Sequence, residues 1–173
     1  MFKFFIPFAH AQSIYEVEPK FYQKHGIKVL FIDLDNTLDS YRSKLPSEQA
    51  KDLVTKLLAV GVQPVIISNN TSTRVSTYAN ALGIEYVNGA GKPFAFKIKR
   101  EIARRGLSPD EVMLVGDQII TDVSAGKNAG IRVLLTEKLV KEDQFTTHFN
   151  RILDRPIRKY HRKRGNLRNW RTL

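Results

Sequence analysis

The sequence contains no cysteine among its 173 residues. This absence excludes disulfide bonds, metal sites with cysteine ligands and any mechanism that uses a cysteine nucleophile. It is also typical of proteins that work in a reducing compartment. Long apolar segments are missing as well, since no run approaches the roughly 20 residues that a transmembrane helix needs. We therefore expect a cytoplasmic protein, with any membrane contact restricted to its surface.

The N-terminal segment is rich in aromatic side chains. Residues 1–26 contain Phe2, Phe4, Phe5, Phe8, Tyr15, Phe21 and Tyr22. The first 11 residues superficially resemble a signal peptide, but their apolar part is shorter than the usual core of about 7–15 residues and contains Pro7. We predict an uncleaved segment that packs on the domain. The alternative is a contact with a membrane interface, where aromatic rings lie at headgroup level.

Positive charge is concentrated at the opposite end of the chain. Of the formal net charge of +11, residues 151–173 contribute +8, with nine Lys or Arg residues against Asp154 alone. We predict a basic C-terminal tail over these residues. It is either a solvated charge run or a surface that binds anionic lipids or RNA. Tyr160 and Trp170, which lie among the arginines, suit both functional interpretations.

Between these ends, residues 27–150 alternate short apolar runs with segments of helical periodicity. The predicted strands are the apolar runs 29–32, 65–69, 84–87, 112–115 and 131–135. Helices are predicted from Ser47 to Gly61, from Thr71 or Ser72 to Gly83, from Pro93 to just before Gly106, and from Thr121 to Ala129. This alternation is typical of an α/β fold with a Rossmann-like, doubly wound parallel sheet.

Two carboxylates follow the first strand of this region. Asp33 and Asp35 come directly after an apolar run, and α/β sheets bind ligands beyond the carboxyl ends of their strands. Carboxylates this close repel each other unless a cation lies between them or one is protonated. A divalent metal with oxygen ligands resolves the repulsion most simply. The alternative is a turn followed by a helix cap.

Polar residues of suitable kinds recur at three further loops. Ser68 and Asn69 end the second strand, Lys92 precedes the third helix, and Asp117 and Asp122 follow the fourth strand. Each alone has an ordinary structural explanation as a cap, a turn residue or a solvated lysine. Because the strands are expected to be parallel, all these residues should meet at one edge of the sheet. Together they predict an active site there.

The order of these motifs resembles the haloacid dehalogenase (HAD) superfamily of phosphohydrolases. The resemblance covers about residues 27–136 and rests on Asp33-Leu34-Asp35-Asn36-Thr37-Leu38, then Ser68, then Lys92, then Gly116-Asp117 followed by Asp122. The first of these motifs is highly specific, whereas Ser68 and Lys92 are weak signals without it. The overall arrangement looks most like the YqeG-type, subclass IIIA phosphatases, which are similar to phosphatidylglycerophosphate phosphatases.

The resemblance implies roles for the two residues of the first motif. Asp33 would be the nucleophile that forms an aspartyl-phosphate. Asp35 would protonate the leaving oxygen and then activate water. Its presence favours phosphate-ester hydrolysis over dehalogenation, because a departing halide needs no proton.

The resemblance also implies a metal site and a phosphate site. Mg²⁺ would be held by Asp33, the Asp35 backbone carbonyl and Asp117, with Asp122 close by. Lys92 would neutralise charge on the nucleophile and the phosphoryl oxygens. Ser68, together with backbone N–H groups around Asn69, would bind those oxygens.

The spacing of the motifs leaves no room for an inserted cap domain. Only 30 residues separate Thr37 from Ser68, and only 23 separate Ser68 from Lys92. An open site suits a phosphate on a bulky molecule, such as a lipid headgroup, a protein or a nucleic acid, unless a second subunit covers the site. We expect a Mg²⁺-dependent phosphomonoester hydrolase, with a phosphatidylglycerophosphate phosphatase as the leading candidate. The alternative function is a phosphatase-fold regulatory protein that docks on RNA or a ribosome through residues 151–173. The oligomeric state stays open.

Overall fold

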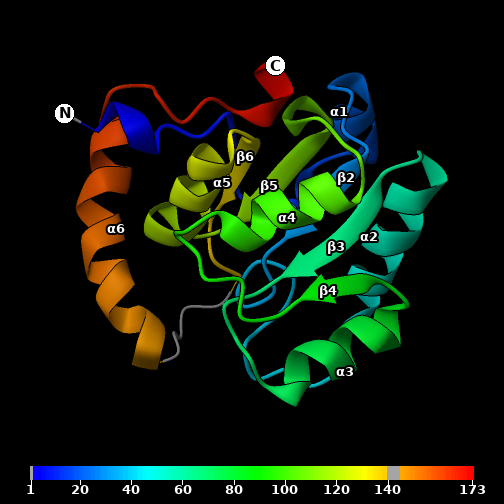
Figure 1. The fold of residues 1–173 in the computed structure, drawn as a ribbon. Coiled ribbons are helices and arrows are strands. Elements are labelled where there is room, and N and C mark those ends of the chain that lie inside the picture. The colour runs from blue at the N-terminus through cyan, green and yellow to red at the C-terminus, as the bar shows by residue number, and fades with distance from the viewer. Residues whose placement is uncertain (1, 140–144) are drawn as a thin grey trace.

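The computed structural model describes residues 2–139 and 145–173, except for the side chains of residues 145–151. Within them, six parallel strands form one sheet in the order β1-β6-β5-β2-β3-β4 (Figure 1). From central β2 the chain passes through β3 and β4 to one edge, and then through β5 and β6 toward the other. The predicted doubly wound α/β fold is confirmed. The strands are β1 (Ala9–Ala11), β2 (Val29–Ile32), β3 (Gln63–Ile67), β4 (Glu85–Val87), β5 (Val112–Gly116) and β6 (Arg132–Thr136).

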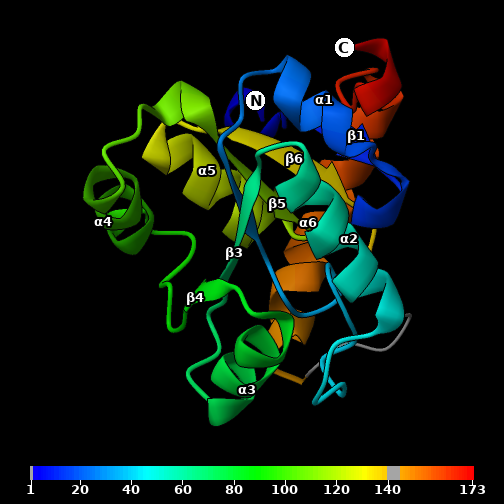
Figure 2. The same ribbon diagram turned by 90° about the vertical axis from the view of Figure 1, so that its right-hand side faces the viewer.

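Helices cover both faces of the sheet (Figure 2). Residues of α1, α2 and α3 belong to one buried apolar cluster, and residues of α4, α5 and α6 belong to the other. The α-helices are α1 (Pro19–Lys24), α2 (Glu48–Ala59), α3 (Thr73–Leu82), α4 (Phe96–Arg104), α5 (Ser124–Ala129) and α6 (Phe145–Lys163). A π-helical turn, η4 (Ile119–Val123), precedes α5, and 3-10 turns lie at η1 (Lys3–Phe5), η2 (Ile14–Glu16), η3 (Pro109–Glu111) and η5 (Trp170–Thr172).

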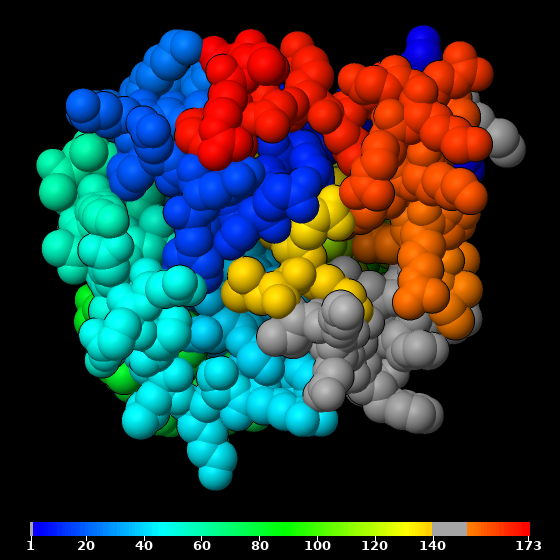
Figure 3. All heavy atoms as spheres, turned by 180° about the vertical axis from the view of Figure 1, so that it is seen from behind, coloured from blue at the N-terminus to red at the C-terminus, as the bar shows by residue number. Residues whose placement is uncertain are grey.

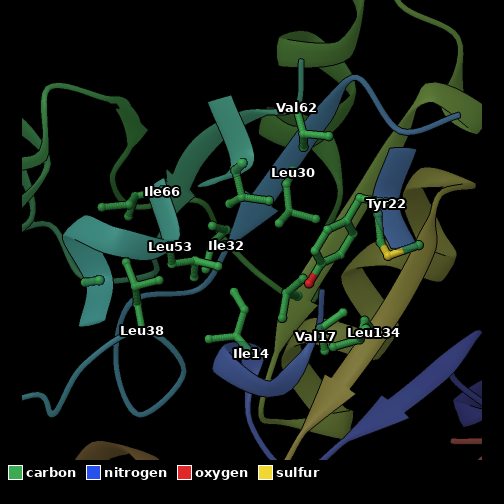
Figure 4. Packing of buried hydrophobic residues seen from close by; sticks show 14 of the residues in the cluster. Ile14, Val17, Tyr22, Leu30, Ile32, Leu38, Leu53, Val62, Ile66 and Leu134 are labelled. Atoms are coloured by element: carbon green, nitrogen blue, oxygen red, sulfur yellow. The ribbon is translucent and has the colours of Figure 1, made fainter. Parts of the chain in front are cut away.

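The central strand β2 is apolar at every position because both of its faces are buried. Leu30 and Ile32 pack into the cluster on the α2 side, while Val29 and Phe31 pack into the cluster on the α4 side. Figure 4 shows Leu30 and Ile32 with their neighbours on the first of these faces. A strand buried on both faces needs a continuous apolar run, and its C-terminal end is then fixed against both layers. This rigid end carries Asp33.

The N-terminal segment adds structure that the sequence analysis did not predict. β1 pairs in parallel with β6 and forms one edge of the sheet. α1 follows it, and its Phe21 and Tyr22 are buried. β1 was missed because Ala9-His10-Ala11 is short and contains a histidine, which gives no apolar signal. The segment packs on the domain through Ile14 and Val17 as well as these two aromatic side chains, while Phe4 is 48% exposed.

The C-terminal residues, expected to form a charged tail, are folded onto the body of the protein. Helix α6 crosses the predicted boundary between 150 and 151 and runs to Lys163. Ile157, His161 and Trp170 are buried, while most of the basic side chains remain exposed. Figure 3 shows the last residues packed against the N-terminal ones, where the His10 N–H donates to the Arg168 carbonyl at 2.8 Å. The sequence analysis classified this segment by its charge and so missed the apolar side of the helix.

One carboxylate joins β6, β1 and α6. A Glu137 oxygen lies 2.8 Å from His10 Nε2, 3.0 Å from Arg158 Nη1 and 2.8 Å from Arg162 Nη2. The hydrogen bond with His10, reinforced by the charges of Arg158 and Arg162, lowers the pKa of Glu137 to about 2. The carboxylate is therefore ionised at neutral pH and ties α6 to the sheet.

Two predicted helix starts are wrong. The helix expected from Pro93 begins at Phe96, because Pro93 lies in a turn closed by a hydrogen bond from the Phe94 N–H to the Gly91 carbonyl. The helix expected from Thr121 begins as the π-helical turn η4 at Ile119. Both corrections affect loops that carry site residues.

In the described residues, no helix combines the length and hydropathy needed to cross a bilayer.

Candidate active site

The sheet order brings the predicted site residues to one edge. β2 lies between β5 and β3, so the loops after these three strands are neighbours at their carboxyl ends. Asp33 follows β2, Ser68 follows β3 and Asp117 follows β5. The Asp33 N–H donates to the Val115 carbonyl at 2.9 Å, which extends the pairing with β5 to the nucleophile position. The switch in strand order at β2 is the expected place for a ligand in such a sheet.

Lys92 reaches into this edge from the loop before α4. Its Nζ lies 2.6 Å from Asp33 Oδ1 and 2.7 Å from Asp122 Oδ1, and it donates to the Ile67 carbonyl at 3.2 Å. Only 2% of its side chain is exposed. Burial alone would lower the pKa of the amine, but the charges of Asp122 and Asp33 raise it above its ordinary value. Lys92 is thus a fixed ammonium between two carboxylates.

Three buried carboxylates lie together at this edge, and Lys92 contacts two of them, Asp33 and Asp122. Ligand oxygens of Asp33, Asp117 and Asp122 lie within 4.8 Å of one another. Desolvation raises the pKa of Asp33, Lys92 opposes this, and the charges of Asp122 and Asp117 raise it further. The site therefore has clustered oxygen donors of the kind that bind a divalent cation.

Gly116 and Gln118 fix the position of Asp122. A Cβ on Gly116 would lie 2.3 Å from Asp122 Cγ, so only glycine allows the carboxylate to approach the end of β5. The other oxygen, Asp122 Oδ2, accepts the Gln118 N–H at 3.0 Å. With Lys92 on Oδ1, both oxygens of Asp122 are held from opposite sides. This role of Gly116 is the structural reason for the Gly-Asp pair in the motif.

Helix α6 supports the acidic loop from outside. Asp154 accepts the Ile119 and Ile120 N–H groups, both at 2.9 Å, and so caps the start of η4. Arg158 Nη2 donates to the Asp117 carbonyl at 2.7 Å. Sequence reasoning missed both residues because it assigned this region to a tail. The only available signal was that Asp154 is the single acidic residue in a strongly basic segment.

Hydrogen bonds fix the loop after β3, which carries Ser68 and Asn69. Ser68 Oγ accepts the Asn70 N–H at 3.0 Å, which fixes the turn after β3. The Asn69 side chain pairs with the Lys92 backbone in both directions, each at 2.8 Å. These two hydrogen bonds of the Asn69 side chain help to position the Lys92 ammonium. Phosphate binding through the backbone around Asn69 stays a prediction.

Asp35 occupies the rim of the site beside an arginine that the sequence analysis did not identify. Arg74 Nη1, from the first turn of α3, lies 2.5 Å from Asp35 Oδ1. The same guanidinium donates to the Ser40 carbonyl at 2.9 Å and the Ser43 carbonyl at 2.8 Å. The next residue, Asn36, has a left-handed backbone conformation at φ +67°. Arg74 had no motif to reveal it, because nothing in sequence links α3 to the loop after β2.

A model of the haloacid dehalogenase-like hydrolases matches residues 6–130. The chain belongs to this family. It is similar to the "Probable phosphatase YqeG" of Bacillus subtilis (strain 168), with 28% identity over 165 residues, 95% of this chain and 96% of that relative. The resemblance to YqeG-type HAD phosphatases is confirmed, and this HAD protein is an enzyme of the phosphatase class.

Solved structures agree with this HAD fold. One is the 3-deoxy-D-manno-octulosonate 8-phosphate phosphatase of Moraxella catarrhalis, in complex with magnesium, phosphate and KDO. Its TM-score is 0.51 at 19% identity, over 70% of this chain and 84% of that one. A putative phosphatase of the same kind from Vibrio cholerae has a TM-score of 0.53 at 19% identity, over 75% and 78% of the two chains. At these identities the likeness concerns the fold.

Proposed function

We propose that this HAD phosphatase is a Mg²⁺-dependent phosphomonoester hydrolase that works through an aspartyl-phosphate. The observation that carries the proposal is the buried Lys92 ammonium, which lies 2.6 Å from the nucleophile Asp33 and 2.7 Å from Asp122. This contact favours the ionised form of Asp33 and so opposes the effect of burial, which raises the pKa of this carboxyl. An ionised carboxylate at the end of a rigid strand is a preorganised nucleophile.

The residues account for both half-reactions. In the first, an Asp33 oxygen attacks phosphorus, the phosphorus–oxygen bond to the leaving group breaks, and Asp35 gives its proton to the departing oxygen. In the second, Asp35 takes a proton from water, whose oxygen attacks phosphorus and breaks the bond to Asp33. Phosphate is released and both carboxyl groups return to their starting states. Ser68 and Lys92 would bind phosphoryl oxygens throughout.

Mg²⁺ is the cation that we assign to the acidic cluster. Asp33 and Asp117 would hold it, together with the Asp35 carbonyl, and Asp122 would orient its surroundings. Hard oxygen donors without histidine or cysteine suit Mg²⁺ rather than a softer metal. When bound, the cation supplies the positive charge that allows an anionic carboxylate to approach an anionic phosphate.

Removal of divalent metal tests this assignment. EDTA is expected to abolish phosphate release from p-nitrophenyl phosphate, and excess Mg²⁺ should restore it. Because the cation binds only the folded cluster, Mg²⁺ at about 100 times its Kd should also add about 2.7 kcal/mol to the free energy of unfolding. An Asp117→Asn variant should lose most of this stabilisation. Full activity in EDTA, with a melting temperature insensitive to Mg²⁺, would contradict the proposal.

We further infer that the substrate is an anionic phospholipid, with phosphatidylglycerophosphate as the specific candidate. The chain between Asp35 and Ser68 contains one loop, α2 and β3, so no cap domain covers the site. Arg74 lies on the leaving-group side, beside the proposed general acid. Within the described residues it uses three of its five N–H donors, on Asp35, Ser40 and Ser43. The remaining donors suit a second phosphate, such as the phosphodiester of this lipid.

Arg74→Lys tests the substrate class. We expect KM to rise about tenfold or more for the water-soluble deacylated headgroup, glycerophosphoglycerol phosphate, because the loss of a charge-assisted hydrogen bond costs about 1.5–3 kcal/mol. For p-nitrophenyl phosphate, which has no second phosphate, KM should change little. A general distortion of the loop after β2 would change KM for both substrates, so the ratio of the two changes in KM isolates the effect on the second phosphate. Equal effects on both substrates would remove Arg74 from substrate recognition.

A further inference from the structure

Two phenylalanines project into solvent beside the active site. Phe94 and Phe96 are 75% and 76% exposed, more than any other large apolar side chain in the described part of the chain. They lie on the segment that runs from catalytic Lys92 into α4, whose first residue is Phe96. Between them Ala95 is buried, which fixes the segment to the body of the protein. Exposed aromatic pairs of this kind mark an interaction surface.

Next to the two phenylalanines, the solvent-facing side of α4 carries positive charge. Ile98, Glu101 and Ile102 face inward, so Lys99 and Arg100 lie three and four residues from Phe96 on the outer side. The carboxylate of α4, on Glu101, is nearly buried and lies 3.0 Å from Arg104. No acidic side chain of this helix therefore offsets the outer lysine and arginine.

The end of helix α5 lies against the same segment. Asn128 Nδ2 donates to the Pro93 carbonyl at 3.0 Å, which brings this helix against the segment that carries Phe94. We call the surface formed by Phe94, Phe96, Lys99 and Arg100 the α4 face. It combines two aromatic rings with two cations.

We propose that the α4 face docks on an anionic phospholipid bilayer and presents the active site to lipid headgroups. This inference rests on the proposed lipid substrate and identifies the surface that would meet it. Aromatic rings enter the boundary between headgroups and acyl chains, while basic side chains bind anionic headgroups. The N-terminal aromatics, which the sequence also offered as membrane contacts, are largely packed: Phe2 contacts Tyr160, and Phe21 contacts Trp170.

Charge decides between a bilayer and a second copy of the chain. In a two-fold dimer through this surface, Lys99 and Arg100 would face the same two cations of the partner copy. Apposed like charges oppose such an interface. An anionic bilayer instead supplies the complementary charge along with an apolar layer for the two rings. The chemistry of the α4 face thus favours a membrane.

The test measures binding of the full-length protein to lipid vesicles. Wild type should sediment with phosphatidylcholine vesicles that contain phosphatidylglycerol, and much less with phosphatidylcholine alone. The double variant Phe94→Ser, Phe96→Ser should bind about tenfold or more weakly, since two large apolar side chains no longer enter the bilayer. Lys99→Glu with Arg100→Glu should weaken binding about 25-fold or more, at about fivefold for each charge removed. Phe4→Ser, which removes an exposed aromatic elsewhere, should bind like wild type.

Activity separates docking from chemistry. The double phenylalanine variant should hydrolyse soluble glycerophosphoglycerol phosphate like wild type, but should lose kcat/KM for phosphatidylglycerophosphate in vesicles. Inactivity of wild type on every substrate would overturn the proposed function, whatever the vesicles show. Vesicle binding that is absent, or unchanged in the double variant, would overturn the docking proposal. So would a dimer that the double variant abolishes, or binding to RNA in place of vesicles.

Discussion

Asp33→Asn is expected to abolish phosphate release, by at least about 10⁴-fold in kcat, because an amide oxygen cannot attack phosphorus and regenerate as a carboxylate. The measurement is a single-turnover assay, with an acid quench that preserves the phosphoenzyme. Wild type should form an acid-stable, base-labile acyl phosphate, and the variant should form none.

The same substitution should leave the fold intact. The introduced asparagine side chain has the shape of aspartate, and its amide oxygen can still accept a hydrogen bond from Lys92. The change removes one of three mutually repelling carboxylates, so the melting temperature without metal should be equal to that of wild type or higher. Asp52→Asn is the matched control, since Asp52 is an exposed carboxylate on α2, and it should keep full activity. Phosphoenzyme or turnover in Asp33→Asn would mean that another group is the nucleophile.

The proposed site residues could be found from sequence because Asp33 and Asp35 follow a strong local signal, which gives weight to the weaker signals of Ser68 and Lys92. β2 is apolar at every position, so its end is unambiguous, and Asp33 and Asp35 follow it directly. Parallel strands then bring Ser68 and Asp117 to the same edge without any knowledge of the loops between them. The structure adds the contacts, such as that of Lys92 with Asp33 and Asp122. Spacing along the chain contains no information about those distances.

The parts that sequence reasoning missed depend on long-range contacts with weak local signals. Arg74 meets Asp35 across a separation of 39 residues, and Asp154 meets the start of η4 across 34 or 35. Neither belongs to a motif. β1 is a three-residue strand that is stabilised by long-range contacts, which include its pairing with β6 and the hydrogen bond from His10 to Arg168. The charge of α6 is conspicuous, whereas the inward residues Asp154, Ile157 and His161 that fix the helix are not.

Lys92→Met is expected to have the largest effect on stability. Methionine fills much of the same volume but leaves Asp33 and Asp122 without the ammonium that contacts both. Removal of one partner from a buried ion pair typically costs about 3–5 kcal/mol. Chemical denaturation in EDTA should show a loss of this size, and turnover should fall with it. Lys99→Met, which removes an exposed lysine from α4, should change the free energy of unfolding by less than about 0.5 kcal/mol.

The dependence of this loss on pH and metal identifies its cause. Without Lys92, the pKa of Asp33 rises further above the unfolded value, so the folded state binds more protons. The destabilisation should be largest at neutral pH and should shrink as the pH falls toward the ordinary carboxyl pKa of about 4. Mg²⁺ should recover part of the stability at neutral pH, because it neutralises the same carboxylates, but turnover should stay low without the ammonium. A loss that is independent of both pH and Mg²⁺ would instead indicate a packing defect around the methionine.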